Sequence, residues 1–327
     1  MKASDLMKVL GFYGRFTPSY SRIGYLARRI GWGSHRPDFD GQRWLVTGAS
    51  GGIGAAIVRA GVNHGATVVA VARNPDKLDA LRASLDPAVR DRMEPCICDL
   101  ASVQDIDRMI ASLDSSQPID VVMNNVGILL NEHSLTAEGC ETTYVTNLLG
   151  HFQLVETLLE KQLLGPNPVV VNMASGGLYN LPLGLGLLNI TDAKRHTGKG
   201  TYAAHKRAQT ALSAYWDRRL RELGGRSYVM HPGWARTEGV RGSLPVFYKI
   251  QGAILRSPAE GADTAVWLAD QRPEEGGIAI WFDRAVRPQH MFEHTKEPQC
   301  SEQDLVDYLS NDLHRLRKTP PATAEAV

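Results

Sequence analysis

Two side chains of the segment TYAAHKRAQ, residues 201–209, have the types and spacing needed for proton transfer. Tyr202 and Lys206 are four residues apart, so on a helix they lie on one face, one turn from each other. A phenol with an ordinary pKa near ~10 is a poor acid or base at neutral pH, but a neighbouring ammonium group lowers that pKa. Since Tyr-x-x-x-Lys is also common as a surface pair, its position in the fold must distinguish the two interpretations.

Ser175 is a third candidate, because it follows the apolar run PVVVNM, residues 168–173, almost directly. Such a run is typical of a strand that is buried on both faces. Ligands of open α/β sheets bind at the carboxyl ends of the strands, where a hydroxyl group can hydrogen-bond a substrate carbonyl. The preceding residue is Ala174, so Ser175 is the hydroxyl that we expect to act at this strand end.

A glycine-rich turn, TGASGGIG at residues 47–54, follows the apolar run at residues 44–46. Glycine at such a turn lets the backbone approach a pyrophosphate, whose charge is stabilised by the amides of the helix N-terminus. The structural alternative is an ordinary turn that uses glycine for positive φ angles. The predicted cofactor contacts in this turn are Gly48, Ser50, Gly51, Gly52, Ile53 and Gly54.

Arg73 lies where the second predicted strand ends, at the position that the ribose of a bound dinucleotide reaches. An enzyme that prefers NAD would present a carboxylate to the 2′-hydroxyl here, whereas a guanidinium can bind a 2′-phosphate through paired hydrogen bonds. The residue type therefore favours NADP(H) over NAD(H). Two alternatives remain: Arg73 is an ordinary solvated arginine, or Asp76 binds the hydroxyl instead.

Apolar runs alternate along the chain with segments of helical spacing. This alternation requires right-handed crossovers and predicts a parallel sheet with helices on both faces. We expect one α/β domain of the Rossmann type, a doubly wound sheet of about seven parallel strands, over residues 40–290. The expected strands are 44–47, 67–72, 94–98, 119–124, 168–173, 226–231 and 277–282. The expected helices are 53–64, 102–113, 139–163, 201–222 and 258–270.

In order and spacing, the motifs resemble those of the short-chain dehydrogenase/reductase superfamily over about 250 residues. Glycine spacing alone would also fit the extended, sugar-nucleotide branch, but an aromatic residue is usual there at the position of Gly52, so the compact branch is favoured. MHPGWARTEGVR and LRSPAEGADTAVWLA, residues 255–269, resemble one subgroup more closely. The matching motifs are TGASGGIG, NNVG at 124–127, Asn147 in VTNLLGHF, Ser175, Tyr202 with Lys206, and HPGWART at 231–237.

The resemblance implies a role for each matching residue. Tyr202 would act as general acid in carbonyl reduction or as general base in alcohol oxidation, while Ser175 would position the carbonyl oxygen. Lys206 would hold the nicotinamide ribose and lower the pKa of Tyr202, and Asn147 would anchor a water molecule that connects Lys206 to solvent. Asp99 would contact the adenine, unless it is only a helix cap. The other implied cofactor contacts are Leu100, Asn125, Val126, Gly127, Pro232, Gly233 and Thr237.

These residues together predict an NADP(H)-dependent oxidoreductase that interconverts a carbonyl and an alcohol in a small, apolar substrate. Residues 176–200 are an insertion beside the site, either a mobile lid or apolar pocket wall or a plain packed loop, and residues 234–257 form a second substrate loop. A dinucleotide-binding regulatory protein is one alternative, but it need not keep the four catalytic residues together. A sugar-nucleotide epimerase or dehydratase is another, disfavoured because the region after the sixth strand is short.

Composition limits the partners and the compartment. The net charge of +1 gives no reason to expect nucleic-acid binding. The four cysteines form no CxxC pair, and Cys96 and Cys98 alternate along a strand, so we expect reduced thiols, a cytoplasmic setting and no metal site. No apolar stretch is long enough to span a membrane. His205 and His231 lie near the predicted site, but most such histidines only pack, so neither is assigned a role.

The two ends of the chain extend beyond the predicted domain. Residues 1–39 form a basic, aromatic extension, whose first 33 residues either lie on an anionic membrane surface or pack their apolar side on the domain. Residues 291–327 contain an amphipathic helix at 301–318, opened by a Ser301 cap, and then a frayed tail. This helix docks either on the domain or on a partner subunit, which leaves a homo-oligomer as one alternative.

Overall fold

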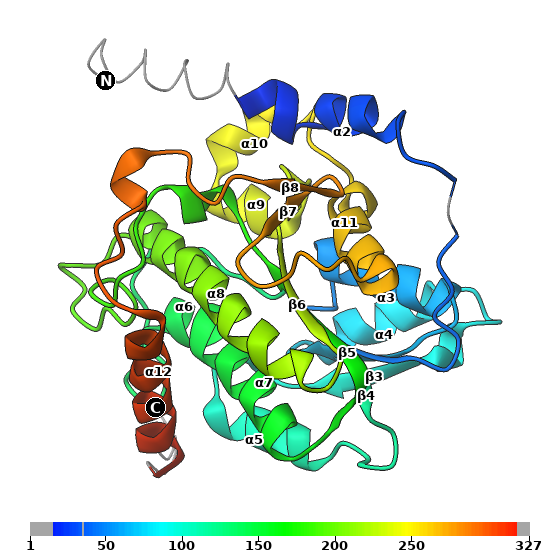
Figure 1. Cartoon of the computed structure of the whole chain (residues 1–327), viewed down its shortest axis with the longest axis horizontal. Helices are drawn as coiled ribbons and strands as arrows, with labels where there is room; N and C mark the ends of the chain where they lie inside the picture. The colour runs from blue at the N-terminus through cyan, green and yellow to red at the C-terminus, as the bar shows by residue number, and fades with distance from the viewer. Residues whose placement is uncertain (1–15, 35, 319–327) are drawn as a thin grey trace.

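The computed structural model describes residues 16–34 and 36–318 and contains one sheet with helices on both faces (Figure 1). The strand order is β3-β2-β1-β4-β5-β6-β7-β8, and all pairings but the last are parallel. This order confirms the doubly wound fold, with its reversal between β1 and β4. The strands are β1 Arg43–Thr47, β2 Thr67–Ala72, β3 Met93–Ile97, β4 Ile119–Asn124, β5 Leu164–Met173, β6 Arg226–Met230, β7 Ile280–Phe282 and β8 Ala285–Arg287.

Neighbouring residues of each central strand enter two separate apolar cores. In β1, Leu45 faces one core while Trp44 and Val46 face the other. The first core is covered by α5 (Val103–Ala111), α7 (Gly150–Glu160), α8 (Gly198–Arg221) and α12 (Glu302–Lys318). The second core is covered by α3 (Gly52–Asn63), α4 (Pro75–Ala83) and α11 (Pro258–Gln271). The continuous apolar runs of the sequence reflect this burial on both faces.

The expectation of about seven parallel strands misses β8, which pairs with β7 in the antiparallel direction. Asp283 and Arg284 form the two-residue turn between them, and both have positive φ angles, 52° and 57°. Such turns usually contain Asn or Gly, so the sequence carries no turn signal here. Ion pairs hold the turn instead: Asp283 contacts Arg256 at 2.6 Å, and Arg284 contacts Asp263 at 2.7 Å.

The helix expected over 139–163 is divided in two. A short helix, α6 (Thr142–Tyr144), is joined to α7 by a π-helical turn over Val145–Leu149. The π turn contains Asn147, and such turns occur frequently at functional sites. The helix begins later than expected because Glu141 caps it, accepting hydrogen bonds from two backbone amides of the first turn.

The chain before β1 packs on the part of the domain that contains β7 and β8. Tyr20 and Tyr25, on either side of the start of helix α2 (Arg22–Arg29), are buried. The guanidinium of Arg256 donates to the carbonyl oxygen of Tyr20 at 3.0 Å. The described residues of the extension therefore pack on the domain through Tyr20 and Tyr25, while Ile23 of α2 is 59% exposed; residues 1–15 lie outside the described part.

The predicted C-terminal helix is present as α12, drawn in red in Figure 1. Leu305 and Leu309 of this helix are fully buried in the first core, and Asp312 accepts a hydrogen bond from the hydroxyl of Tyr144 at 2.9 Å. The helix thus docks on the domain of its own chain. None of the helices within the described ranges is long and apolar enough to cross a membrane.

Candidate active site

The glycine-rich turn between β1 and α3 has a backbone that excludes side chains. Gly48 and Gly52 have positive φ angles, 65° and 52°. A Cβ atom on Gly54 would lie 2.1 Å from the carbonyl oxygen of Gly48, and one on Gly52 would lie 3.0 Å from the methyl group of Thr237. The N-cap of α3 is Gly51, so no side chain caps the first amides of this helix. The cradle therefore fits a pyrophosphate group, as predicted from its glycines.

Asn125 fixes the glycine-rich turn to the end of β4. Its side-chain amide donates to the carbonyl oxygen of Thr47 at 2.8 Å, and its backbone N–H donates to the Thr47 hydroxyl at 3.0 Å. Val126 and Gly127 follow at the reversal of strand order, where a dinucleotide binds in such sheets. A Cβ atom on Gly127 would lie 3.3 Å from Nζ of Lys206, so these predicted cofactor contacts adjoin the predicted catalytic lysine.

The predicted adenosine side of the cofactor site lies at the ends of β2 and β3. Arg73 is exposed, and in the described part of the chain its guanidinium has no ion-pair or hydrogen-bond partner. The carboxylate of Asp99 accepts a hydrogen bond from the backbone N–H of Ala101 at 3.0 Å, while the N-cap of α5 is Ser102. Asp99 is therefore not the helix cap, although its predicted contact with adenine stays a prediction. Leu100, next to it, is buried.

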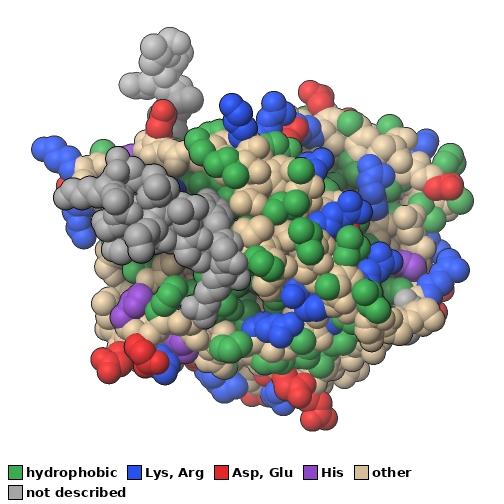
Figure 2. Space-filling model, turned by 90° about the horizontal axis from the view of Figure 1, so that it is seen from above, with side chains coloured by type: hydrophobic (Ala, Val, Ile, Leu, Met, Phe, Trp, Pro, Cys, Tyr) green, Lys and Arg blue, Asp and Glu red, His purple; other side chains and the backbone are tan. Residues whose placement is uncertain are grey.

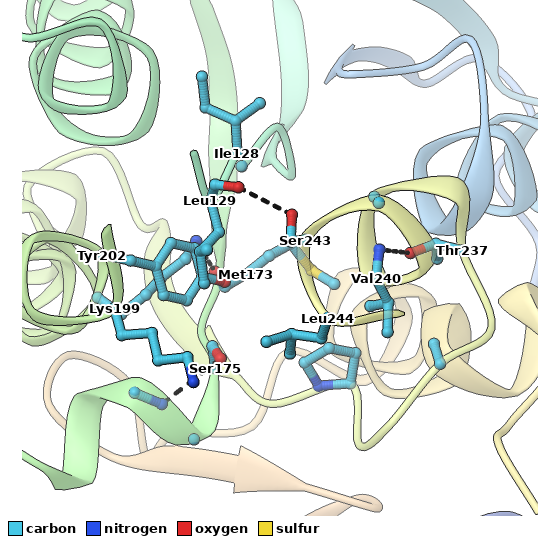
Figure 3. Close-up of a pocket in the computed structure, with 18 of the residues that line it drawn as sticks. Ile128, Leu129, Met173, Ser175, Lys199, Tyr202, Thr237, Val240, Ser243 and Leu244 are labelled. Carbon is cyan, nitrogen blue, oxygen red and sulfur yellow. Dashed lines mark hydrogen bonds between the residues drawn. The ribbon is translucent and has the colours of Figure 1, made fainter. Parts of the chain in front are cut away.

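Ser175 follows the end of β5, and Tyr202 and Lys206 lie in the first turns of α8. Figure 3 shows Tyr202 and Ser175 side by side in the cavity wall. The Ser175 hydroxyl lies close enough to the Tyr202 phenol to lower its pKa. Nζ of Lys206 lies 5.6 Å from the centre of the Tyr202 ring, one helical turn away. Gly177 adjoins that ring, since a Cβ atom there would lie 3.5 Å from Cδ1 of Tyr202, in ordinary van der Waals contact. The sequence thus identified three side chains that the fold brings together.

The ionisation of these groups differs from the prediction in one respect. Burial raises the pKa of the Tyr202 phenol above its ordinary value, although the hydrogen bond from Ser175 opposes this. Burial also lowers the pKa of Lys206 to about 7. At neutral pH the amine therefore carries its charge only part of the time, and the predicted lowering of the phenol pKa is not found. The phenol is held in its protonated form, which is the form that donates a proton.

Lys206 is held by acceptors that the sequence did not point to. Its Nζ donates to the carbonyl oxygen of Met173 at 2.8 Å and to the side-chain oxygen of Gln209 at 3.0 Å. The amide of Gln209 donates in turn to the carbonyl oxygen of Asn147 at 2.8 Å. The Asn147 side chain bonds both backbone groups of Ile128 at 2.8 Å. Gln209 thus bridges the two residues that the resemblance connects through water, and the water itself stays a prediction.

A cavity of about 1070 Å³ opens beside these residues (Figure 3). Its walls include the ends of β5 and β6 and the segment 234–257, which contains helices α9 (Glu238–Ser243) and α10 (Pro245–Gln251). The hydroxyl of Ser243 donates to the carbonyl oxygen of Leu129 at 2.8 Å and joins two walls. Apolar side chains dominate the lining away from the catalytic residues. They are Ile128, Leu129, Leu130, Met173, Trp234, Val240, Leu244 and Phe247.

The segments around the cavity are anchored at several points. Thr237 caps α9, accepting from the backbone N–H of Val240 at 3.1 Å, and also packs over Gly52. Gly233 has a φ of 72°, and a Cβ atom there would lie 2.4 Å from the Arg256 guanidinium. Pro232 accepts a hydrogen bond from the same arginine at 3.4 Å. The predicted cofactor residues Pro232, Gly233 and Thr237 therefore lie between the glycine-rich turn and the cavity.

The insertion at 176–200 is a packed segment. Leu178, Leu188 and Ile190 are buried, and the carbonyl oxygen of Leu183 accepts a hydrogen bond from the backbone N–H of Gln299 at 2.7 Å. The segment therefore combines the two alternatives: most of it is packed, while Gly176, Gly177, Asn180 and Lys199 form part of the cavity wall. Its first residues still line the cavity, since Gly176 and Gly177 follow Ser175 directly.

The two nearby histidines have different surroundings. Nε2 of His205 lies 2.7 Å from the carbonyl oxygen of Leu188, and the ring is buried, so this residue anchors the insertion. His231 instead lines the cavity. Sequence analysis did not identify Gln209, which lies three positions after Lys206. It named His231 but assigned it no role.

Comparisons with known proteins show the family of the chain. Residues 42–184 match the family model described as short chain dehydrogenase. The chain is 30% identical over 285 residues to dehydrogenase/reductase SDR family member 12 of Bos taurus, covering 85% of this chain and 88% of that protein. It is 27% identical over 243 residues to retinol dehydrogenase 13 of Homo sapiens, covering 70% of this chain and 72% of that protein.

A solved structure extends the likeness to the fold. It is described as angucycline C-6 ketoreductase LanV with bound NADP, is 19% identical, has a TM-score of 0.61, and covers 77% of this chain and 97% of its own. Members of the matching family are oxidoreductases that bind a nicotinamide dinucleotide and act on small molecules. The chain belongs to the short-chain dehydrogenase/reductase superfamily, close to the proteins called family member 12.

Proposed function

We propose that this protein interconverts an apolar carbonyl compound and its alcohol with NADP(H). The observation that supports this most strongly is the convergence of Ser175, Tyr202 and Lys206 on one wall of an apolar cavity that also reaches the predicted cofactor contacts Gly127 and Thr237. A regulatory protein that only bound the dinucleotide would need the glycine-rich turn, but it would not need Tyr202 and Ser175 side by side in the cavity.

The chain's own residues would position the substrate and supply a proton. When bound, NADPH supplies the hydride in reduction. Ser175 donates a hydrogen bond to the carbonyl oxygen, and Tyr202 transfers its proton to that oxygen as negative charge develops. The phenol is protonated at neutral pH and so carries the proton that it would donate, although its raised pKa makes it a weaker acid than an ordinary phenol. Lys206, whose Nζ donates to Met173 and Gln209, orients the ribose. When protonated, it also provides positive charge beside the phenol.

The preference for NADP(H) rests on Arg73. Its exposed guanidinium, without an ion-pair partner in the described residues, is free to bind a 2′-phosphate at the end of β2. Asp76, the nearest carboxylate on α4, lies in the first turn of that helix, where its charge interacts favourably with the helix dipole. The solved ketoreductase structure with NADP is a further reason to test this cofactor first.

The proposal is tested by measuring the loss of NADPH absorbance with a panel of apolar ketones and aldehydes. Turnover by the wild type and a loss of about 10³-fold or more in Tyr202→Phe, with unchanged NADPH affinity, would support it. Equal turnover by both proteins would refute the role of Tyr202. NADPH binding without turnover of any carbonyl compound would favour the regulatory alternative. If incubation with a sugar nucleotide yields a product with an altered sugar, the epimerase or dehydratase would be favoured.

We also propose that the face formed by α2 and α10 rests on an anionic membrane surface. The start of α2 is joined to the segment that follows α10, because the backbone N–H of Arg22 donates to the carbonyl oxygen of Ile254 at 2.8 Å. Ile23 is 59% exposed and Ile250 is 71% exposed on this face. Figure 2 shows hydrophobic side chains interleaved there with Lys and Arg side chains. Apolar anchors with basic neighbours are the pattern of a peripheral membrane contact, and α10 also lines the cavity through Phe247.

A further inference from the structure

His231 contains a polar atom that no group in the described ranges satisfies. The residue follows β6 and is 3% exposed. Its Nδ1 accepts a hydrogen bond from the backbone N–H of Gly233 at 2.8 Å. A ring nitrogen that accepts carries no hydrogen, so the N–H of the neutral imidazole is on Nε2. That Nε2–H has no acceptor among residues 16–34 and 36–318.

The imidazole is held rigidly in this orientation. Its ring stacks on Tyr20 with 4.7 Å between the ring centres and 14° between the planes, and it meets the edge of Phe282 at 5.5 Å. Burial, aided by the positive charge of Arg256 and opposed by Asp283, lowers the pKa of His231 to about 3. The ring therefore stays neutral at working pH and keeps one donor with a fixed direction.

This donor lies beside the predicted catalytic serine. A Cβ atom built on Gly176 would lie 3.6 Å from Nε2 of His231, and Gly176 is the residue directly after Ser175. All three residues line the cavity. The ring nitrogen is thus on the same wall as the group that would hold the reacting carbonyl oxygen, where Nε2 is itself buried behind Gly176 with less than 1 Å² exposed.

We propose that His231 is a substrate-recognition residue whose Nε2–H binds a second oxygen of the substrate, close to the carbonyl that reacts. The substrate class is then a 1,2- or 1,3-dicarbonyl compound, or the corresponding hydroxyketone, on an apolar skeleton. A buried donor without an acceptor is unfavourable, so a ligand that supplies the acceptor binds preferentially over one that leaves the donor unpaired. This inference rests on the proposed carbonyl chemistry and specifies its substrate.

Two variants separate the donor from the packing of the ring. In His231→Asn the side-chain oxygen can still accept from the Gly233 N–H, but the distal donor is gone. In His231→Gln the amide nitrogen reaches the position of Nε2 and restores a donor. Both proteins are first compared with the wild type for melting temperature and NADPH affinity, so that a misfolded variant is recognised. The probes are 1-phenylpropane-1,2-dione, 1-phenylbutane-1,3-dione and, as the matched monoketone, 1-phenylpropan-1-one.

We expect His231→Asn to lower kcat/KM for at least one dione by about tenfold, mainly through KM, while kcat/KM for the monoketone changes by less than about twofold. His231→Gln should recover most of the loss. An equal loss on diones and monoketone would show that the ring only supports the site and would overturn the inference. Unchanged kcat/KM for both diones would overturn it as well.

A binding measurement tests the recognition role of His231 independently of the proposed carbonyl chemistry. If the wild type oxidises NADPH with none of the three ketones, the carbonyl chemistry on these substrates fails. Calorimetric titration of the diones into protein saturated with NADP⁺ then tests His231 alone. About tenfold weaker binding to His231→Asn than to the wild type, with monoketone binding unchanged, would support the recognition role. Equal binding of the diones to both proteins would refute it.

Discussion

The side-chain oxygen of Gln209 lies 3.0 Å from Nζ of Lys206, and its amide nitrogen lies 2.8 Å from the carbonyl oxygen of Asn147. All three residues are at most 2% exposed. A single buried amide therefore accepts from the amine and connects it to the π-helical turn across the core. Since a carbonyl-type acceptor stabilises the charged form of the amine, Gln209 helps Lys206 to carry charge at neutral pH.

Replacing that amide should affect activity in a pH-dependent way. In Gln209→Met the charged form of Lys206 loses an acceptor, so its pKa, about 7 in the wild type, falls further. We expect kcat to fall by about tenfold at pH 8 and by less at pH 6, where the amine is still protonated. Gln153→Met is the matched control, a buried glutamine on α7 that bonds Val103 at 2.7 Å and should leave the pH profile unchanged.

The low pKa of Lys206 also predicts how stability varies with pH. Its pKa is about 7 in the folded protein and ordinarily 10.5, so between these values the unfolded chain binds more protons than the folded one. The free energy of unfolding therefore rises with pH across this window. Relative to Lys206→Met, the wild type should gain stability from about pH 7 to pH 10, as measured by urea denaturation. A difference that stays constant would contradict the buried, weakly basic amine.

Cofactor choice should depend on Arg73. Arg73→Ala should weaken NADPH binding by about ten- to a hundredfold while changing NADH binding by less than about threefold, because charge-assisted hydrogen bonds to the 2′-phosphate are lost. Arg36→Ala removes an exposed arginine before β1 and serves as the control. Fluorescence titration of both cofactors provides the measurement. Equal losses for NADPH and NADH would mean that Arg73 does not contact the phosphate.

The buried ion pair between Arg256 and Asp283 should be important for stability. Both side chains are 1% exposed, with oxygen–nitrogen distances of 2.6 and 2.9 Å. Asp283→Asn leaves the guanidinium with uncompensated charge, so we expect a loss of about 3–5 kcal/mol in the free energy of unfolding. Asparagine tolerates the positive φ at this position, so backbone strain does not confuse the result. Asp91→Asn, in an exposed pair, should cost less than about 1 kcal/mol.

The membrane proposal predicts a charge-dependent binding to vesicles. The wild type should sediment with vesicles that contain phosphatidylserine more than with neutral phosphatidylcholine vesicles, and added salt should weaken the effect. The double change Ile23→Asp and Ile250→Asp should lower the partition by about tenfold or more. Ile97→Asp, at a side chain of similar exposure, 57%, on β3, is the control. Equal sedimentation of the double variant and the wild type would exclude this face.

The fold was largely predictable because its evidence is local. Runs such as residues 68–72 are apolar throughout, which indicates strands buried on both faces, and the glycine-rich turn marks the first crossover. Strand β8 was not predictable, since the turn at Asp283 and Arg284 is stabilised by Arg256 and Asp263, which are distant in the sequence. A single sequence does not show which distant charges meet.

Part of the candidate site was likewise predictable from the sequence, and part of it was not. Tyr202 and Lys206 share a helical face, so their proximity follows from spacing, and Ser175 is placed by the strand that it follows. Gln209 could have been found by the same helical spacing, since it lies three residues after Lys206. His231 could not, because its free donor is apparent only once Gly233, Tyr20 and Gly176 are assembled around the ring.

The packing of Tyr20 against His231 has a practical consequence for recombinant production. A shortened gene product beginning at residue 42, where the family match begins, would retain the predicted catalytic and dinucleotide-binding motifs. It would nevertheless lose one aromatic partner of the imidazole, and Arg256 would lose two of its carbonyl acceptors, those of Ser19 and Tyr20. Kinetic constants from such a trimmed enzyme would describe an altered pocket, so assays require the residues upstream of the Rossmann core.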